Sequence, residues 1–267
     1  MIDAHVHVWR IGANGCVWPG ADLPAIHRDF DLAEYRAVAE AVDGVLLVQS
    51  QADAADTLWL LGLDDPLIAG VIGWTDFAAP DACERVTALA SSPRLRGLRP
   101  MVQGLADDWY DRADDAALAA MAARGLVLEA LVQPRHLASL ARLAARHPAL
   151  TIVIDHAAKP QADAIDSWAR ALDSIASHAN VQCKLSGLVT ETAPIADAFA
   201  VIWRAFGPGR LLWGSDWPVV NCAASYGEWR EIALALVPVE HHPAVFDANA
   251  RSVYRLGSGR PDGGKGS

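Results

Sequence analysis

Two histidines separated by a single residue lie near the start of the chain and are the first candidates for chemistry. His5 and His7 belong to residues 2–9, where aliphatic and polar residues alternate. Alternation with a period of two predicts a β-strand that turns both imidazoles to one face. Such a pair can hold a divalent metal or flank a substrate, and two hydrogen-bonded histidines on a half-exposed strand are the alternative.

Two later apolar runs also end on a residue that can do acid–base or metal chemistry. Asp216 ends the run at residues 211–216, and Pro218 then stops regular strand pairing. A carboxylate in this apolar setting is costly unless it meets a cation or a proton donor. His156 ends the run at residues 151–156. The alternatives are an aspartate that caps the next loop and a hydrogen-bonded loop histidine.

Other polar or aromatic residues near the ends of apolar runs are candidate substrate contacts. The planar Arg99 guanidinium suits a carboxylate or paired hydroxyls, with a salt bridge to a helix as the alternative. Lys184 lies in an apolar run and needs a partner, which Glu129 can supply unless it binds sugar hydroxyls itself. Tryptophan rings near strand ends suit the apolar faces of a sugar. The candidates are Arg99, Glu129, Lys184, Trp74, Gln49 and Trp217.

Eight strand-like apolar runs position these residues, and segments with helical spacing separate the runs. This alternation predicts an α/β fold, a (β/α)8 TIM-like barrel in a single domain at residues 1–256. Its strands end at one rim, where the candidate residues would share a pocket. An open doubly wound sheet is the alternative, but it needs a Gly-rich phosphate loop after an early strand, and no GxGxxG or GxxxxGK follows one of the early runs. The runs cover residues 2–9, 45–49, 67–74, 95–100, 126–131, 151–156, 181–186 and 210–216.

The segments between the runs complete this plan. Residues 12–31 are rich in Gly, Pro and Asp and are predicted to form a long loop. Residues 257–267 are rich in glycine and are predicted to be disordered. Helices are predicted at residues 32–42, with Asp31 as the cap, and at residues 116–124, 137–147, 165–179 and 195–206.

Composition excludes several classes of protein. The net charge of −10 argues against a nucleic-acid or anionic-membrane partner. The sequence has no recognisable leader and no apolar run of about 18 residues. Its four cysteines lack CxxC spacing, which indicates reduced thiols, so we expect a cytoplasmic protein. Cys183 lies in a strand-like run that favours packing, and no serine lies in a GxSxG elbow.

Three motifs together resemble the amidohydrolase superfamily. They are His5-x-His7, DHxxKP at residues 155–160 and WGSDWP at residues 213–218. The resemblance is closest to the amidohydrolase-2 group, in its sugar-lactonase and dicarboxylate-lactonase branch, and it covers nearly the whole chain. It implies a distorted barrel of the amidohydrolase type. In metal-using members one divalent ion, often zinc, is held by the residues that correspond to His5, His7, His156 and Asp216.

The same resemblance implies hydrolysis of a small sugar lactone, an aldonolactone such as fuconolactone or rhamnonolactone, to its sugar acid. Some lactonases of this branch work without metal, and there the aspartate, here Asp216, activates water. Binuclear members carry a lysine at a mid-barrel strand end, where this chain has Arg99. We therefore expect at most one divalent metal, zinc before others, which catalysis need not require. The catalytic set implied is His5, His7, His156 and Asp216.

Other functions stay open on the sequence alone. A metal-dependent decarboxylase, or an aromatic or dicarboxylate lactone hydrolase, could use the same barrel. A sugar-acid-binding protein without activity is the alternative from another class. The expected partner is a small-molecule lactone, and neither the particular lactone nor the oligomeric state follows from the sequence.

Overall fold

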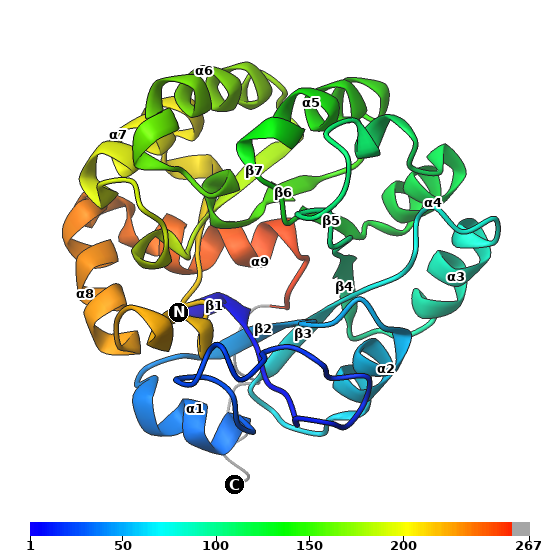
Figure 1. The fold of residues 1–267 in the computed structure, drawn as a ribbon, viewed down its shortest axis with the longest axis horizontal. Helices are drawn as coiled ribbons and strands as arrows, with labels where there is room; N and C mark the ends of the chain where they lie inside the picture. Colours follow the sequence, from blue (N-terminus) through cyan, green and yellow to red (C-terminus); the bar gives the residue numbers. More distant parts are fainter. Residues whose placement is uncertain (258–267) are drawn as a thin grey trace, which may run out of the picture.

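The computed structural model describes residues 1–257, in which eight parallel strands pair in sequence order. Helices surround the strands in a ring (Figure 1). The predicted TIM-like barrel is confirmed, and each of the eight predicted runs overlaps one strand. The strands are β1 (Ile2–Val6), β2 (Gly44–Val48), β3 (Ile68–Gly73), β4 (Leu95–Leu98), β5 (Val127–Ala130), β6 (Ile152–Ile154), β7 (Val181–Leu185) and β8 (Leu211–Trp213).

The helices follow the predicted segments closely. The first begins after Asp31, whose carboxylate accepts hydrogen bonds from the amides of Ala33 and Glu34 at 2.9 and 3.0 Å. It ends at Val38, before the predicted end, and Ala41 then has a φ of 62°. The helices are α1 (Leu32–Val38), α2 (Ala54–Gly62), α3 (Ala82–Leu89), α4 (Asp115–Arg124), α5 (Leu137–Arg146), α6 (Ile165–Ala176), α7 (Ile195–Phe206), α8 (Tyr226–Leu236) and α9 (Asn249–Val253).

All eight strands end before the predicted runs do, and for β6 and β8 the reason is the backbone. β6 stops at Ile154 and β8 at Trp213. Beyond them His156 has a φ of 51° and Asp216 a φ of 58°, and left-handed residues cannot continue a strand. The candidate side chains therefore lie on turns just past the strands.

The barrel closes at a seam between β1 and the segment that follows β8. The amide of Asp216 donates to the carbonyl of His5 at 2.9 Å, and the amide of His7 donates to the carbonyl of Trp217 at 2.7 Å. Gly214 permits this approach, because a Cβ there would lie 2.6 Å from the Cβ of His5. The seam joins the two ends of the sequence that carry the candidate residues.

Apolar side chains fill the barrel interior and the layer between strands and helices. Inside, Leu46, Ile72 and Val153 pack with Tyr254, which follows α9. α9 crosses the open centre of the strand ring in Figure 1. Each fully buried aliphatic side chain of this kind contributes about 1.5–3 kcal/mol to folding.

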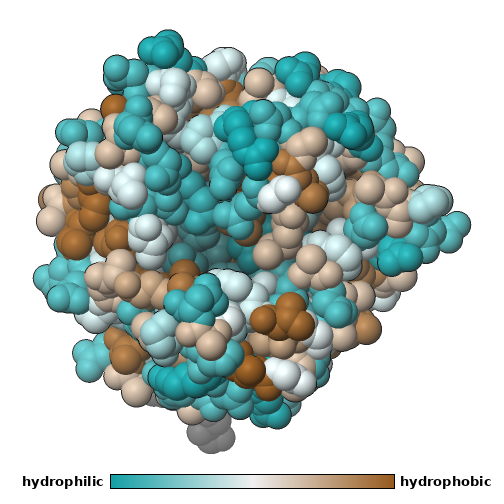
Figure 2. All heavy atoms as spheres, viewed as in Figure 1, coloured by the Kyte–Doolittle hydropathy of each residue, from teal (hydrophilic) through white to brown (hydrophobic). Residues whose placement is uncertain are grey.

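Other expectations concern the surface and the thiols. The four cysteines are free, as predicted. Within residues 1–257, every helix is too short or too polar to cross a bilayer. A hollow near the centre of the face in Figure 2 is coloured mainly as hydrophilic. The predicted disordered tail lies outside the described residues from position 258 onward.

Candidate active site

His5, His7 and Asp216 converge at the barrel seam. The Nε2 atoms of the two histidines lie 3.2 Å apart. The Oδ1 atom of Asp216 lies 3.6 Å from the His5 Nε2 and 3.5 Å from the His7 Nε2. All three residues are buried. The predicted convergence of the two imidazoles on one point is therefore present in the fold, and the carboxylate joins them.

Buried Asp3 holds the two sides of this seam in register. Its carboxylate accepts hydrogen bonds from the amide of Ser215 at 2.8 Å, the amide of His5 at 3.2 Å and the hydroxyl of Tyr35 at 2.8 Å. Burial raises the pKa of Asp3 to about 6, against the lowering effect of these donors. One carboxylate therefore fixes the backbone next to Asp216 and the backbone of His5.

His156 reaches the same place from a turn with an unusual backbone. Residues 156–159 are four consecutive left-handed residues without a glycine, with φ values of 51°, 49°, 61° and 57°. Such a conformation costs roughly 1–2 kcal/mol per residue and needs support from its surroundings. The His156 Nδ1 lies 2.9 Å from the Ser186 hydroxyl and 3.9 Å from the Asp216 Oδ2. Gly187 leaves room for the ring, since a Cβ there would lie 2.6 Å from that Nδ1.

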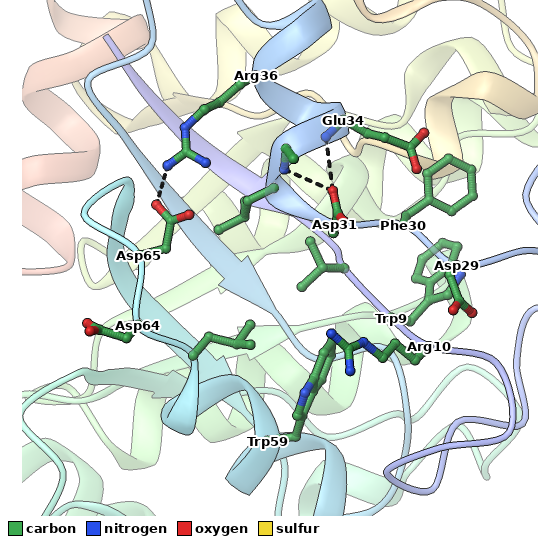
Figure 3. A pocket seen from close by; sticks show the side chains of 14 residues that line it. Trp9, Arg10, Asp29, Phe30, Asp31, Glu34, Arg36, Trp59, Asp64 and Asp65 are labelled. Carbon is green, nitrogen blue, oxygen red and sulfur yellow. Dashed lines mark hydrogen bonds and ion pairs between the residues drawn. The ribbon is translucent and has the colours of Figure 1, made fainter.

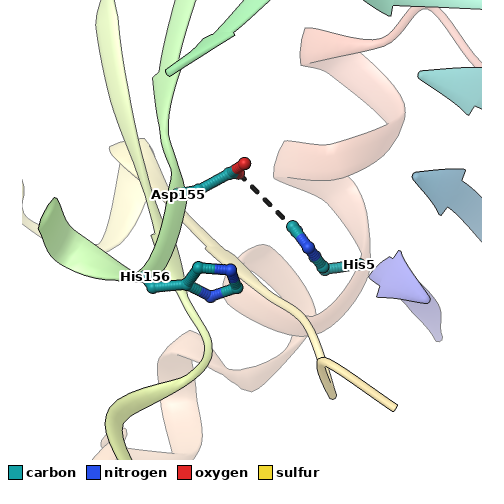
Figure 4. A group of neighbouring side chains, drawn as sticks. All are labelled: His5, Asp155 and His156. Carbon is teal, nitrogen blue, oxygen red and sulfur yellow. Dashed lines mark ion pairs between the residues drawn. The ribbon is translucent and has the colours of Figure 1, made fainter. Parts of the chain in front are cut away.

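A buried network of charges lies beneath these groups. The Lys184 ammonium pairs with Glu129 at 2.7 Å and with Asp155 at 3.2 Å, and it donates to the His5 Nδ1 at 3.0 Å. The Arg99 guanidinium pairs with the second oxygen of Asp155 at 3.4 Å. Two cations thus balance two carboxylates, which is what makes their burial tolerable. Figure 4 shows His5 directed at Asp155, with His156 beside them.

Hydrogen-bond partners assign the protons of the two strand-one histidines. The His7 Nδ1 lies 2.7 Å from the Val48 carbonyl, which can only accept, so this nitrogen carries a proton. His5 accepts from Lys184 at Nδ1, so its own proton lies at Nε2, directed toward His7 and Asp216.

Burial sets the protonation of the site. Burial lowers the pKa of His156 to about 4 and lowers that of His5 well below its ordinary range. Burial alone would raise the pKa of Asp216, but His156, His7 and His5 together hold it well below its ordinary value. At neutral pH the site therefore contains an ionised aspartate near the neutral imidazoles of His5 and His156.

A cavity of about 370 Å³ opens over these groups. Its polar wall contains His7, His156, Asp216, Arg99 and Lys159. Two of these are cations that already have anionic partners, since Arg99 pairs with Asp155 and Lys159 with Glu191 at 3.0 Å. The volume suits one small molecule.

The loop after β1 forms the apolar wall of the cavity. Val17 and Trp18 line it, opposite Met101. Buried Gln51 holds this loop: its Oε1 accepts from the amides of Val17 and Trp18 at 3.0 and 3.1 Å, and its Nε2 donates to the Trp18 carbonyl at 2.7 Å. Asp56 fixes Gln51 in turn by accepting from its amide at 3.3 Å.

Comparisons with known proteins agree with this geometry. A family model described as "Amidohydrolase" matches residues 2–256. The chain belongs to the amidohydrolase family. A relative from Burkholderia ambifaria, named L-fucono-1,5-lactonase, is 39% identical and is aligned over 98% of this chain and 97% of its own length. A second protein of that name, from Burkholderia multivorans, is 38% identical over 96% of both chains. A crystal structure of a Burkholderia multivorans amidohydrolase with bound zinc is 34% identical, with a TM-score of 0.86 over 96% of this chain and 99% of that one.

Several residues predicted to contact substrate lie elsewhere in this amidohydrolase. Lys184 and Glu129 are fully buried and bind each other, and Gln49 is fully buried with its amide donating to the Arg99 carbonyl at 2.9 Å. Trp217 packs edge-on against Phe30 and Tyr35. Trp74 is outside the residues that line the cavity. Of the six candidates, only Arg99 lines it.

Sequence reasoning also passed over residues that the site uses. Asp155 is part of the DHxxKP motif and is not among the predicted site residues, yet it pairs with Lys184, Arg99 and His5. Its position directly before His156 was the available signal. Gln51 lies two residues beyond Gln49, the polar end of the run predicted at residues 45–49, and nothing in the sequence around Gln51 indicates a role in the site. Its role depends on a loop 33 residues away.

The donor atoms can hold a metal ion. His5, His7 and Asp216 form one group of possible ligands, and His5, Asp155 and His156 form a second. In the first group the ligand atoms are 3.2–3.6 Å apart, and a tetrahedral ion with bonds of about 2.0–2.1 Å separates its ligands by about 3.3 Å. An ion there needs the lone pair of the His5 Nε2, so the ring proton of His5 must move to Nδ1, the nitrogen that Lys184 contacts.

A larger cavity, of about 590 Å³, lies outside the barrel between α1 and α2 (Figure 3). Its carboxylates already have partners. Asp31 caps α1, Asp65 pairs with Arg36, and Glu34 pairs with Arg28. Because these acidic groups serve the local structure, the candidate active site remains the cavity at the seam.

Proposed function

We propose that this amidohydrolase hydrolyses a small sugar lactone to its sugar acid. The observation that carries the proposal is the position of the Asp216 carboxylate, which lies 3.6 Å from the His5 Nε2 and 3.5 Å from the His7 Nε2 and forms part of the cavity wall. The two relatives named L-fucono-1,5-lactonase, which align over nearly their whole lengths, support the substrate class. An ester bond in a ring needs a base, a nucleophilic water and a stabilised carbonyl oxygen.

Asp216 is the base in this proposal. Its carboxylate takes a proton from a water molecule while the water oxygen attacks the lactone carbonyl carbon. The bond from that carbon to the ring oxygen then breaks, and Asp216 returns the proton to the departing oxygen. One residue serves both proton transfers, and the atoms balance as lactone plus water giving the hydroxy acid.

Other cavity groups stabilise the negative charge that forms on the carbonyl oxygen. Arg99 lines the cavity and is held in place by Asp155, so its N–H groups can donate to this oxygen. His156 is neutral near pH 7, so it can orient the lactone by hydrogen bonding without repelling Arg99. His7 is fixed by Val48 and supports the Asp216 carboxylate from below.

His5, His7 and Asp216 would hold the single divalent metal, with His156 adjacent. When bound, such an ion lowers the pKa of its water toward about 7 and polarises carbonyls. The zinc in the related Burkholderia multivorans structure supports zinc as the first candidate. The Nε2 atoms of His5 and His7 also contact each other at 3.2 Å, which supports a site that works without a resident ion.

The charges around the cavity favour a neutral lactone over a dicarboxylate. Both cavity cations, Arg99 and Lys159, are already neutralised by Asp155 and Glu191. A dicarboxylate lactone or a decarboxylase substrate needs uncompensated cations to offset its charge. We therefore propose a neutral aldonolactone of the fuconolactone or rhamnonolactone kind.

A pH-indicator assay tests this proposal. The purified protein is supplied in parallel with neutral aldonolactones and with a dicarboxylate lactone, each with and without a chelator. We expect acid release from at least one neutral lactone in both conditions. Turnover of the dicarboxylate lactone alone would contradict the proposed substrate class, and turnover of no lactone would contradict the proposed reaction.

A further inference from the structure

Two fully buried tryptophans donate hydrogen bonds to the backbone beside the two left-handed residues of the site. The indole Nε1 of Trp168 donates to the carbonyl of Ala157 at 2.7 Å. The indole Nε1 of Trp229 donates to the carbonyl of Gly214 at 2.9 Å. Both side chains have no exposed surface. Neither tryptophan lines the cavity, so neither touches a substrate there.

The two contacts share one arrangement. Trp168 lies in α6, the helix after β6, and it binds the turn that carries His156. Trp229 lies in α8, the helix after β8, and it binds the segment that leads to Asp216. In each case a helix returns to fix the turn at the end of the strand before it.

The backbone at both places needs such support. His156 and Asp216 have φ values of 51° and 58°, in the region that favours glycine. A residue of this kind keeps its conformation only where its surroundings determine it. At Asp216, the neighbouring amides already have partners: Ser215 donates to Asp3 and Asp216 donates to His5. Trp229 binds the carbonyl of Gly214, two residues before Asp216.

At His156 the turn is held from two sides. The Lys159 ammonium, which lines the cavity, pairs with Glu191 at 3.0 Å. From α6, Trp168 binds the Ala157 carbonyl, and the buried methyl groups of Ala157 and Ala158 leave little space for another conformation. The indole therefore fixes the peptide between Ala157 and Ala158, inside the left-handed turn that begins at His156.

We propose that Trp168 and Trp229 are positioning residues, whose indole N–H groups hold the left-handed backbone that aims His156 and Asp216 into the cavity. The predicted effect of the two tryptophans on turnover rests on the proposed lactone hydrolysis. Their effect on the backbone at His156 and Asp216 does not depend on that reaction. Loss of either N–H leaves the fold and cavity in place but lets the catalytic side chain leave its position. Loss of either N–H should therefore lower kcat more than it changes KM.

The chain offers a matched control in Trp213. It is also fully buried, and its indole nitrogen has no hydrogen-bond partner among the described residues. Trp168→Phe, Trp229→Phe and Trp213→Phe remove the same atoms from equally buried sites. Only the first two remove a hydrogen bond.

The kinetic test measures kcat and KM for a lactone with each variant. We expect Trp168→Phe and Trp229→Phe to lower kcat at least 10-fold with KM changed less than 3-fold, and Trp213→Phe to change kcat less than 2-fold. We also expect Trp168→Phe to have less than a 2-fold effect when it is added to His156→Ala, since it acts through that side chain. Equal losses of kcat in all three single variants would overturn the proposal. A 10-fold or larger loss of kcat when Trp168→Phe is added to His156→Ala would also overturn it.

A second readout is independent of turnover. The imidazole 15N resonances of His156, assigned by their absence from His156→Ala, should shift in Trp168→Phe and stay in place in Trp213→Phe. If the wild-type protein hydrolyses no lactone, the proposed function fails and this measurement still tests the positioning. Unchanged His156 resonances in folded Trp168→Phe would overturn it.

Discussion

The amide of Asp216 donates to the carbonyl of His5 at 2.9 Å, so the first strand and the segment after the last one are joined where their side chains meet. The geometry of the site therefore depends on the closure of the barrel. A change at the seam alters the distance between the carboxylate and the imidazoles directly. A change of the same size elsewhere in the barrel does so only through several layers of packing.

Gly214→Ala tests this dependence. The added Cβ would lie 2.6 Å from the His5 Cβ, so the seam must open. We expect a loss of about 1–3 kcal/mol in unfolding free energy and at least a 10-fold loss of turnover. Urea denaturation and a lactone assay measure the two effects. Gly227→Ala is the control, because its Cβ meets no atom within 4 Å, and equal losses in both variants would contradict the argument.

Zinc titration by calorimetry tests the metal site. We expect at most one ion per chain, because both groups of possible ligands share His5. His7→Asn should weaken binding at least 10-fold, because it removes one of three ligand atoms 3.2–3.6 Å apart. His178→Asn, away from the site, should leave binding unchanged. Two ions per chain in the cavity would contradict the ligand set.

Tyr254→Phe should destabilise the protein more as the pH rises. Burial raises the pKa of Glu129 to about 7 despite Lys184, and the Tyr254 hydroxyl donates to Glu129 at 2.6 Å. Loss of this donor raises the pKa of Glu129 further, so the folded variant retains a proton to higher pH and loses stability relative to the wild type as pH rises through 7.

The expected costs for Tyr254→Phe are about 1 kcal/mol at pH 5.5 and about 2–3 kcal/mol at pH 8.5, measured by urea unfolding. Tyr110→Phe is the control. Its hydroxyl is buried with no hydrogen-bond partner among residues 1–257, so its cost should be the same at both values. An identical cost of Tyr254→Phe at pH 5.5 and 8.5 would argue against an ionised Glu129 as its acceptor.

Gln51→Met should weaken substrate binding. Three hydrogen bonds from this one side chain hold Val17 and Trp18 over the cavity, and methionine keeps the volume but makes none of them. We expect KM to rise about 5- to 20-fold and kcat to fall less than 3-fold, since the loop touches the substrate and not the reacting atoms. Gln182→Met in β7 is the control. A kcat loss without a change in KM would place the role of Gln51 elsewhere.

The sequence predicts the barrel well because each strand is a short apolar run with a polar end. It also predicts the convergence of His5 and His7, since a period of two turns both to one face. The sequence does not predict how deeply each polar side chain is buried. Lys184 and Glu129 occupy strand positions like those of cavity residues, yet they point into the interior and neutralise each other.

The backbone at the site is the other feature that the sequence conceals. Residues 156–159 form a left-handed turn without a glycine or an asparagine to signal it. The support comes from Trp168 and Glu191, whose contacts depend on the folded barrel. Asp216 likewise has a φ of 58° only because β1 and α8 hold its segment.

The central claim is that the Asp216 carboxylate activates water for lactone hydrolysis, and Asp216→Asn tests it most directly. The measurement is the rate of acid release from a neutral aldonolactone by the variant and the wild type, with circular dichroism confirming that both are folded. We expect the variant to lose at least 1,000-fold in kcat, roughly 4 kcal/mol of transition-state stabilisation. A folded variant that retains more than about a tenth of the wild-type rate would contradict the claim.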